Sequence, residues 1–278
     1  MRDNELEKKL QKVLDDGKNV WVIGDVHGFN KTLRRLVGKL ILGPNDYVIL
    51  LGDLIDRGPN SYDVIQFVKS LPNIVCVKGN HEEMMAEVLS IEDLESPGVE
   101  LMTWLYTGGL ATITSYINAY TDENGEESTT KLDEKIEQDK KWIDQLPSEI
   151  VLNDWRLVHA GYNPGIDLDS QTDDDLLHIR ETFHLATKPI DKHRTVLFGH
   201  TPTAGLPGYN KESWGQVWYS SLVLADGRSA AIGLDTCLFH NLDAPAVLTA
   251  YNLQNGMVIQ QERIEKWNRK AIRQANEV

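Results

Sequence analysis

The feature that most constrains this chain is a pattern repeated three times between residues 20 and 82. A short apolar run ends in Gly followed by Asp or Asn, and helical periodicity comes after it. The runs cover 20–23, 47–51 and 74–77, and they end in Gly24-Asp25, Gly52-Asp53 and Gly79-Asn80. Strands that alternate with helices form βαβ units, whose parallel strands are buried on both faces. The sequence therefore predicts an α/β fold.

Polar side chains should gather at one edge of this sheet, because ligands of parallel sheets bind beyond the carboxyl ends of the strands. Two later apolar runs, 156–158 and 195–199, lead into His159 and His200. We expect five strand ends to converge on one rim. Its candidate metal ligands are Asp25, His27, Asp53, Asn80, His159 and His200.

This set of donors indicates the kind of metal. Carboxylates, imidazoles and one amide suit Mn, Fe or Zn, whereas an oxygen-only cage favours Mg or Ca and a thiolate set favours structural Zn. Asp25 and His27 are two positions apart, so in an extended segment both side chains would reach one ion. A single Gly-Asp after a strand is usually a turn, and a single His is usually structural. Five such ends together favour a metal centre.

Composition excludes several classes of protein. Lys and Arg number 28 against 42 Asp and Glu, a net charge of −14 that repels nucleic acid over most of the surface. No window approaches about 18 apolar residues, and the first residues lack the apolar core of a signal peptide. Cys76 and Cys237 are too few for a disulfide framework. We expect a cytoplasmic protein with reduced thiols, no membrane partner and no nucleic-acid partner.

Other phosphate chemistries lack their motifs. The chain has no Walker A loop and no GxGxxG. A tyrosine-phosphatase loop needs Arg six positions after Cys, but Cys76 and Cys237 are followed there by Glu82 and Asp243.

The motifs GD-x-HG at 24–28, GD-x-x-DRG at 52–58, GNHE at 79–82, HAG at 159–161 and GH at 199–200 occur in this order. In order and spacing the chain resembles the PPP-type (calcineurin-like) metallophosphoesterases over residues 20–253, and most resembles their bacterial and phage Ser/Thr protein phosphatase branch. The stretch from His159 to Gly165, followed by Leu176 to Arg180, also resembles that branch.

The resemblance implies a four-layer fold, a central mixed β-sandwich flanked by helices. It also implies two divalent ions, most often Mn, with Fe or Zn possible in its place. Asp25, His27 and Asp53 would hold one ion, and Asp53, Asn80, His159 and His200 the other. A hydroxide bridging the ions would attack the phosphoester directly.

The resemblance also assigns the remaining site residues. Arg57 and Arg180 would bind the phosphoryl oxygens, and His81, oriented by Asp56, would act as general acid. Hydrolysis of a phosphoester needs both the ions and these residues. The two ions neutralise the phosphate and lower the pKa of the attacking water. An alkoxide also leaves poorly unless it is protonated.

Two positions depart from the branch: His178 stands where Trp is common, and Cys237 where Gly is usual. Neither is a proposed ligand, so the departures concern the shape of the substrate groove. The alternative activity is hydrolysis of diadenosine tetraphosphate or another nucleotide pyrophosphate. That branch typically lacks a carboxylate at position 56 and has GNHD, so Asp56 and Glu82 favour a protein phosphatase. A non-catalytic scaffold would predict the loss of Arg57, His81 or Arg180. All three residues are present, which disfavours a scaffold.

The pattern along the chain predicts one metallophosphoesterase domain over 19–262. A helical extension (1–18, with Gly17 ending its helix) precedes it, and a charged tail (263–278) follows it. Residues 95–150 interrupt the pattern and are expected to form a helical excursion with Gly108-Gly109 and a helix near 131–146. Asn255-Gly256 between two apolar runs predicts a type I′ hairpin on a second sheet. We expect a phosphoprotein or small phosphoester as substrate, and a monomer.

Overall fold

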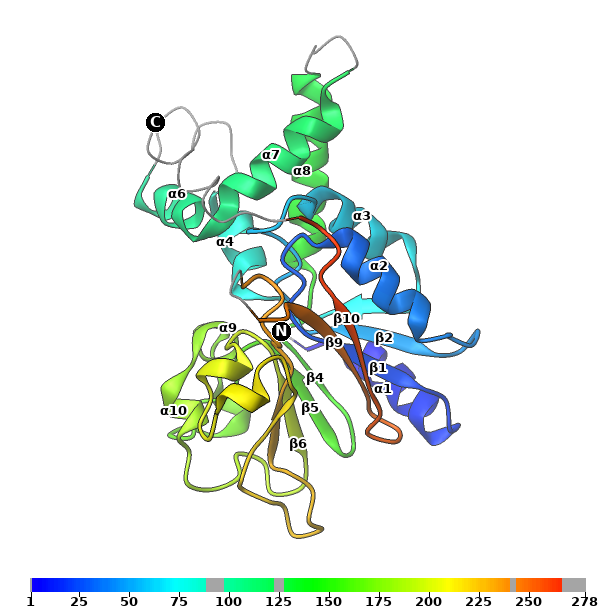
Figure 1. Ribbon diagram of the computed structural model, residues 1–278, viewed down its shortest axis with the longest axis vertical. Coiled ribbons are helices and arrows are strands. Elements are labelled where there is room, and N and C mark those ends of the chain that lie inside the picture. The colour runs from blue at the N-terminus through cyan, green and yellow to red at the C-terminus, as the bar shows by residue number, and fades with distance from the viewer. Residues whose placement is uncertain (1, 89–97, 123–127, 241–243, 267–278) are drawn as a thin grey trace.

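The computed structural model describes residues 2–88, 98–122, 128–240 and 244–266 (Figure 1). Its first five-stranded sheet has the strand order β10-β9-β1-β2-β3. The parallel core β1-β2-β3 carries the first three predicted runs, and β9 pairs antiparallel with β1. The bounds are β1 Val20–Ile23, β2 Tyr47–Leu50, β3 Ile74–Cys76, β9 Val247–Asn252 and β10 Val258–Glu262.

The second five-stranded sheet has the order β4-β5-β6-β8-β7. Strands β5, β6 and β8 run parallel, and β4 and β7 are antiparallel edge strands. The bounds are β4 Glu149–Val151, β5 Trp155–Val158, β6 Thr195–Phe198, β7 Trp218–Tyr219 and β8 Ala231–Gly233. The five predicted strand ends therefore come from two sheets, three from the first and two from the second.

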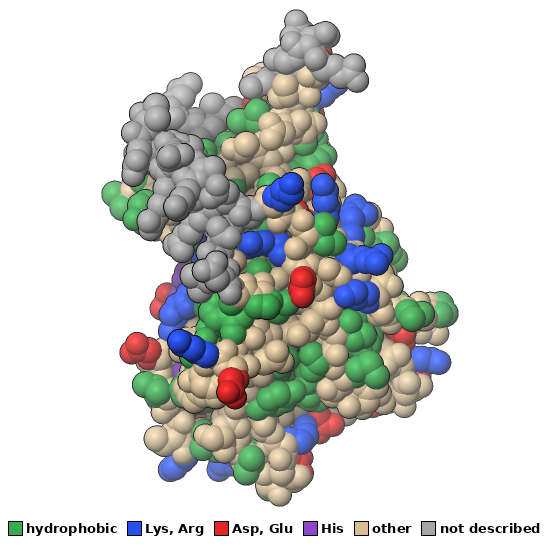
Figure 2. Space-filling view, in the orientation of Figure 1, with side chains coloured by type: hydrophobic (Ala, Val, Ile, Leu, Met, Phe, Trp, Pro, Cys, Tyr) green, Lys and Arg blue, Asp and Glu red, His purple; other side chains and the backbone are tan. Residues whose placement is uncertain are grey.

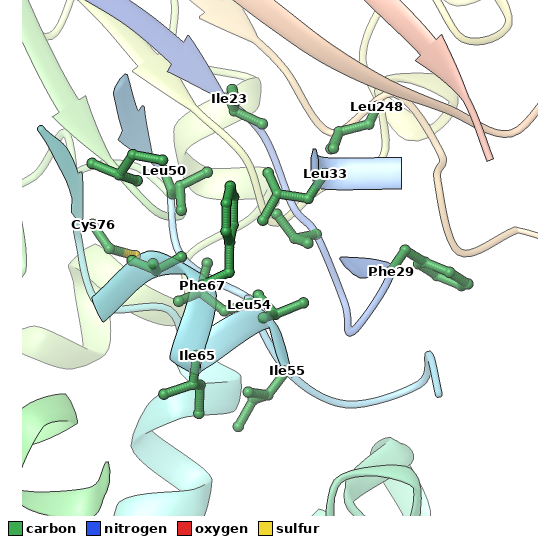
Figure 3. Packing of buried hydrophobic residues seen from close by; sticks show 14 of the residues in the cluster. Ile23, Phe29, Leu33, Leu50, Leu54, Ile55, Ile65, Phe67, Cys76 and Leu248 are labelled. Atoms are coloured by element: carbon green, nitrogen blue, oxygen red, sulfur yellow. The ribbon is translucent and has the colours of Figure 1, made fainter. Parts of the chain in front are cut away.

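The two sheets pack face to face, and successive side chains along a strand pack into two different hydrophobic cores. In β1, Val20 and Val22 face the second sheet, while Trp21 and Ile23 face the helices. Figure 3 shows the helix-facing core, where side chains of β1, β2, β3 and β9 meet those of the helices on that face, such as Leu33 and Phe67. The order helix, sheet, sheet, helix is the predicted four-layer α/β sandwich, and the fold class is confirmed.

Helices cover both outer faces. Against the first sheet lie α2 Asn30–Lys39 and α3 Ser61–Ser70, and α4 Asn80–Val88 follows β3 directly. Against the second sheet lie α9 Asp173–His178 and α10 Glu181–His184, whose Leu176 and Phe183 pack on Val196 and Phe198. The short helices η2 Leu168–Ser170, η3 Thr203–Gly205 and η4 Lys211–Ser213 lie in the connections.

A helical insertion separates β3 from β4 and projects from the body of the molecule (Figure 1). It contains α6 Val99–Trp104, the π-helical turn η1 Leu105–Gly109, α7 Leu110–Tyr120 and α8 Thr129–Asp144. This agrees with the predicted excursion and with its predicted helix near 131–146. Residues 95–97 and 123–127 of the excursion lie outside the described residues.

Both ends of the described chain are tied to the body. Helix α1 Asn4–Asp15 lies in the predicted extension and buries Leu10 between the sheets, and Gly17 follows it in a left-handed conformation. Of the predicted tail, only 263–266 is described, and Glu265 is buried there. Its carboxylate accepts from the backbone N–H groups of Lys31 and Thr32, so it caps the start of α2.

The C-terminal hairpin differs from the prediction in two ways. It extends the first sheet rather than a second one, because β9 pairs with β1. Its turn is not type I′, which needs positive φ at both central residues. Only Gly256 has a positive φ there, and the turn is closed by Gly256 N–H bonding Asn252 O at 2.8 Å. Asn255 instead uses its side chain to accept from Met257 N at 2.9 Å.

Among the described residues, no helix is both long and apolar enough to cross a lipid bilayer. Cys76 and Cys237 are buried free thiols. Although the chain is acidic overall, Figure 2 shows Lys and Arg side chains gathered over the face formed by α2. The negative charge is therefore unevenly distributed over the surface.

Candidate metal centre

The predicted ligands follow strands β1, β2, β3, β5 and β6, in loops or, for Asn80, at the start of α4. Seven non-glycine residues of the described chain have positive φ, and five of them are candidate site residues: His27, Asp53, Asp56, Arg57 and His200. Left-handed backbone is unfavourable for residues with a Cβ, and such residues concentrate at functional sites, where surrounding contacts hold them in place. The backbone strain thus coincides with the predicted site.

Asp53 stands between two groups of donor atoms. Its Oδ1 lies 3.3 Å from His159 Nε2, whereas its Oδ2 lies 3.6 Å from His27 Nε2 and 3.7 Å from His81 Nε2. Asp53 is fully buried, and burial alone would raise its pKa. The nearby His159, His81, His27 and Arg57 outweigh burial and hold the pKa below its usual range. An ionised carboxylate with one oxygen toward each group has the geometry of a bridging ligand.

The group on the Oδ1 side joins both sheets. Asn80 Oδ1, from the start of α4, lies 2.9 Å from His159 Nε2 and 2.9 Å from His200 Nδ1. The two ring nitrogens are 3.1 Å apart. An amide oxygen, a carboxylate oxygen and two imidazole nitrogens therefore converge here, as predicted.

The group on the Oδ2 side contains His27 and Asp25, whose Nε2 and Oδ2 are 3.9 Å apart. The predicted reason for their meeting is wrong, since the segment is not extended: His27 has φ 45°. The turn, rather than strand alternation, brings its ring beside Asp25. His81 Nε2 also joins this donor group, so the structure allows it a ligand position that the sequence did not assign.

The imidazoles are oriented for binding a cation. His27 and His159 direct Nδ1 to the backbone carbonyls of Ile55 (3.0 Å) and Leu51 (2.7 Å), which leaves the Nε2 lone pairs facing Asp53. A hydrogen bond of this kind fixes the tautomer of metal-binding histidines. Burial lowers the pKa of His27, His159 and His200, which favours the neutral imidazole that a metal ligand requires.

These donors fit two divalent cations. One atom of the centre, Asp235 Oδ2, is buried with no hydrogen-bond partner in the described part of the chain. Burial, followed by repulsion from Asp235 and Asp53, raises the pKa of Asp25 well above its usual range. A set of close carboxylates that repel one another is stabilised by positive charge placed between them.

Comparison with known proteins agrees with this geometry. A family model described as calcineurin-like phosphoesterase matches residues 18–204, more than half of the chain. The chain belongs to the calcineurin-like phosphoesterase family. Members of this family use two divalent metal ions, which the two donor groups around Asp53 would hold.

Curated relatives of this phosphoesterase carry two kinds of name. "Serine/threonine-protein phosphatase 2" of Escherichia coli is 38% identical over 93 residues, which cover 33% of this chain and 39% of the relative. "Bis(5'-nucleosyl)-tetraphosphatase, symmetrical" of Serratia proteamaculans is 37% identical over 101 residues, covering 31% and 36%. The matched segments thus span less than half the length of these relatives.

Solved structures share the fold of the phosphoesterase. A putative diadenosine tetraphosphatase superposes with a TM-score of 0.57 at 21% identity, covering 90% of this chain and 95% of that one. A metallophosphoesterase from Sphaerobacter thermophilus gives a TM-score of 0.53 at 16% identity, covering 94% of each chain. At these identities the likeness concerns the fold alone.

Beside the donor groups, the phosphoesterase has a buried His–Asp pair. His81 Nδ1 lies 2.5 Å from Asp56 Oδ2, and both side chains are inaccessible to solvent. His81 Nε2 points the other way, toward Asp53. The ring therefore has one nitrogen held by a carboxylate and the other facing the metal centre.

The two predicted arginines also lie at the centre. Arg57 Nη1 contacts His27 Nε2, and its guanidinium stacks 4.2 Å from the centroid of Phe239. Arg180 Nη1 donates to the backbone oxygen of His200 (3.3 Å) and to Thr201 Oγ1 (3.0 Å). Burial and the positive charge of Arg57 lower the pKa of Arg180, while Asp25 and Asp53 raise it. The two guanidinium groups are thus close enough to the carboxylates and to each other for their charges to interact.

Sequence reasoning missed Asp235 as a site residue. It is buried beside Asp25, and burial raises its pKa to about 6. The signal was present, because Asp235 follows β8 just as Asp25 follows β1 and Asp53 follows β2. A rule that searched each strand end for Asp would have found it.

Glu82 and His178 each connect two elements beside the metal centre. Glu82 accepts from the backbone N–H groups of Asp53 (2.8 Å), Leu54 (2.8 Å) and Gly79 (3.0 Å), so it ties together the loops after β2 and β3. His178 Nε2 lies 2.7 Å from Glu83 Oε2, and this hydrogen bond raises the pKa of His178. The pair joins α9 to α4 at the half-exposed edge of the site.

Proposed function

We propose that this phosphoesterase is a binuclear, metal-dependent phosphomonoesterase that hydrolyses phosphoserine and phosphothreonine. The observation that carries the proposal is the His81–Asp56 pair at 2.5 Å, with His81 Nε2 directed toward Asp53. A seryl or threonyl alkoxide is a poor leaving group, and it needs a positioned proton donor. The pair suits that task.

The metal centre would hold two divalent ions, proposed to be manganese. Asp25, His27 and Asp53 would hold one, and Asp53, Asn80, His159 and His200 the other. When bound, the ions supply charge neutralisation and a water of lowered pKa. Asp53, with one oxygen on each side, would set the spacing between the two positions.

The chain's own residues would do the rest. Arg57 and Arg180 supply permanent positive charge and paired donors for the phosphoryl oxygens. His81 in its imidazolium form gives the Nε2 proton to the departing oxygen. Its Nδ1 proton stays on the ring, where the Asp56 carboxylate accepts its hydrogen bond. Direct attack by water leaves no phosphorylated residue on the protein.

A second candidate is hydrolysis of symmetrical dinucleoside tetraphosphates. It is favoured by the relative of Serratia proteamaculans, which is named for that activity. There the leaving group is a nucleotide phosphate, which departs more readily than an alkoxide and needs the His81–Asp56 pair less. The presence of a buried, fully hydrogen-bonded Asp56 is our reason for placing the monoesterase first.

One experiment separates the two. Manganese-loaded protein is given a phosphoserine peptide, a phosphothreonine peptide, p-nitrophenyl phosphate and diadenosine tetraphosphate in parallel, and kcat/KM is compared. We expect the phosphopeptides to exceed the dinucleotide. A preference for the dinucleotide would replace the first candidate with the second. Hydrolysis in oxygen-18 water should place the label directly in phosphate, and a trapped phosphoenzyme would contradict direct attack.

The acid role has its own test. His81→Asn should lower kcat for a phosphoserine peptide by about 10²–10⁴-fold, and lower turnover of p-nitrophenyl phosphate far less, because p-nitrophenolate leaves without protonation. His193→Asn, an exposed histidine on the same molecule, is the matched control. Equal losses on both substrates would show that His81 does not act as the acid. Metal content measured on each variant excludes loss of the ions as the cause.

A further inference from the structure

The turn that carries Asp56 and Arg57 is held in an unfavourable conformation. Both residues have left-handed backbone, with φ 68° and 67°. Residues with a Cβ are strained in this region, and such a conformation persists only where its surroundings determine it. The contacts that hold this turn therefore decide where the Asp56 carboxylate and the Arg57 guanidinium lie.

Many of those contacts come from the helical insertion. The Thr112 hydroxyl donates to Asp56 Oδ1 (2.6 Å) and accepts from Asp56 N–H (2.9 Å). The Trp104 indole N–H donates to Asp56 Oδ2 at 2.8 Å, the same oxygen that His81 contacts. The backbone oxygen of Gly108 accepts from Arg57 N–H at 3.2 Å. Trp104 and Thr112 are fully buried, so these bonds do not compete with water.

The Gly108-Gly109 pair is what allows this approach. Gly108 has φ 129°, and a Cβ there would lie 2.8 Å from Arg57 Cγ and 2.9 Å from its backbone N. A Cβ at Gly109 would lie 2.4 Å from the Trp104 ring. One glycine therefore lets the π-helical turn η1 touch the Asp56–Arg57 turn, and the other lets it close over the indole. Single π-helical turns are often found at functional sites.

We propose that the helical insertion is a positioning device for the general acid, with Trp104 and Thr112 as positioning residues. They fix the Asp56 carboxylate by both oxygens, so that His81 Nε2 is held toward the scissile phosphoester. The indole shares Oδ2 with His81, and this contact fixes the plane of the carboxylate as well as its position. The inference rests on the proposed function, because it requires His81 to donate a proton.

The test uses the leaving-group dependence of turnover in the full-length, manganese-loaded protein. Trp104→Phe removes the indole N–H and keeps an aromatic ring in its place. We expect kcat for a phosphoserine peptide to fall about tenfold and kcat for p-nitrophenyl phosphate to change by less than about twofold. Thr112→Val should likewise lower kcat for the phosphoserine peptide more than kcat for p-nitrophenyl phosphate.

Two matched controls come from the same molecule. Trp218→Phe removes an indole N–H that donates to Pro207 O at 2.8 Å, outside the centre. Thr114→Val changes an exposed threonine on the same helix whose hydroxyl donates to Leu110 O in its own helix at 2.8 Å. Neither control should alter the ratio of the two kcat values. An unchanged ratio in Trp104→Phe, or an equal loss on both substrates, overturns the inference.

A readout without catalysis separates positioning from simple loss of stability. In the metal-free protein, the proton between His81 Nδ1 and Asp56 Oδ2 should give a downfield NMR resonance, which Trp104→Phe should shift and Trp218→Phe should not. If Trp104→Phe does not shift this resonance, the indole and His81 do not share Asp56 Oδ2 as proposed.

His81→Asn is measured beside these variants. If His81→Asn changes the ratio of the two kcat values and Trp104→Phe does not, the positioning inference alone fails. If His81→Asn leaves the ratio unchanged, the acid role in the proposed function fails, and the positioning inference fails with it. If both variants change the ratio, the double variant should have the same ratio as His81→Asn alone.

Discussion

Asp139 is the buried junction of the helical insertion with the body, and its charge can be removed by one substitution. Its Oδ1 accepts from Lys69 Nζ (2.6 Å) and Lys135 Nζ (3.1 Å), and its Oδ2 accepts from Gln66 Nε2 (2.9 Å) and Tyr116 OH (2.9 Å). The side chain is fully buried. It therefore joins α3, α7 and α8 through four hydrogen bonds to one carboxylate.

Asp139→Asn keeps the shape and offers a single acceptor oxygen, so its NH₂ group must face two donors. The variant loses either the bonds from both lysines or those from Gln66 and Tyr116, and in both cases the lysines lose their ionic partner. The cost should be about 3–5 kcal/mol, as is typical of a broken buried ion pair. For a chain of this size each kcal/mol lowers Tm by about 2 °C. We thus expect Tm to fall by about 8 °C.

The assay is thermal unfolding followed by circular dichroism, with EDTA present so that metal binding adds nothing to stability. Asp144→Asn is the matched control, because it removes the same charge from an exposed position at the end of the same helix. It should melt within about 1 °C of the parent protein. If Asp139→Asn and Asp144→Asn melt together, the carboxylate is not the junction that the contacts indicate. Hydrogen exchange should also show α7 and α8 losing protection before β1.

Three further predictions concern the metal centre. Burial raises the pKa of Asp235 to about 6 from 3.8, so the folded state binds a proton that the unfolded state releases. Asp235 alone should then lower the free energy of unfolding of the metal-free protein by on the order of 3 kcal/mol as pH rises from about 4 to 7, and urea titrations in which Asp235→Asn shows the same pH dependence as the parent protein would contradict this. Asp53→Asn keeps one acceptor oxygen, so it should lose at least one ion in elemental analysis, and retention of both ions would contradict a bridging role. In Gly199→Ala the new Cβ would lie 2.1 Å from Asp25 Oδ1, so one ion should be lost, whereas Gly205→Ala, with its nearest contact at 3.9 Å, should keep two.

The strand ends could be predicted because their signal is local. An apolar run of four or five residues followed by Gly-Asp specifies both a buried strand and a polar turn. The edge at which the turns meet follows from the parallel direction of the strands. Asp25, Asp53 and Asn80 are therefore together in the structure for the reason that the sequence supplied.

The division into two sheets could not be predicted in this way. Strand pairing depends on which apolar faces meet after the chain has folded, and β1, β2, β5 and β6 all have every residue or nearly every residue buried. Strands buried on both faces carry no alternation that would assign them to one sheet or another. His159 and His200 reach the centre from the opposite sheet, across the sandwich rather than along one edge.

The supports of the site were the least predictable part. Trp104 and Thr112 bond Asp56 from 48 and 56 positions away, and nothing in the local sequence of the insertion marks either residue for that contact. The Gly108-Gly109 pair was visible as a break in the helical pattern, but its meaning needs the positions of Arg57 and the indole.

Because the supporting contacts come from distant parts of the chain, the sequence motifs alone do not form the site. The five strained residues of the centre cannot hold their own backbone, since each strained turn is held by groups from other parts of the chain. Glu82 holds the turn at Asp53, and the insertion holds the turn at Asp56 and Arg57. A short peptide with the sequence of residues 24–58 would carry the GD-x-HG and GD-x-x-DRG motifs, but it would relax to ordinary backbone angles. The chemistry of this centre therefore depends on non-local contacts, and variants of those contacts should change rates without touching a single proposed ligand.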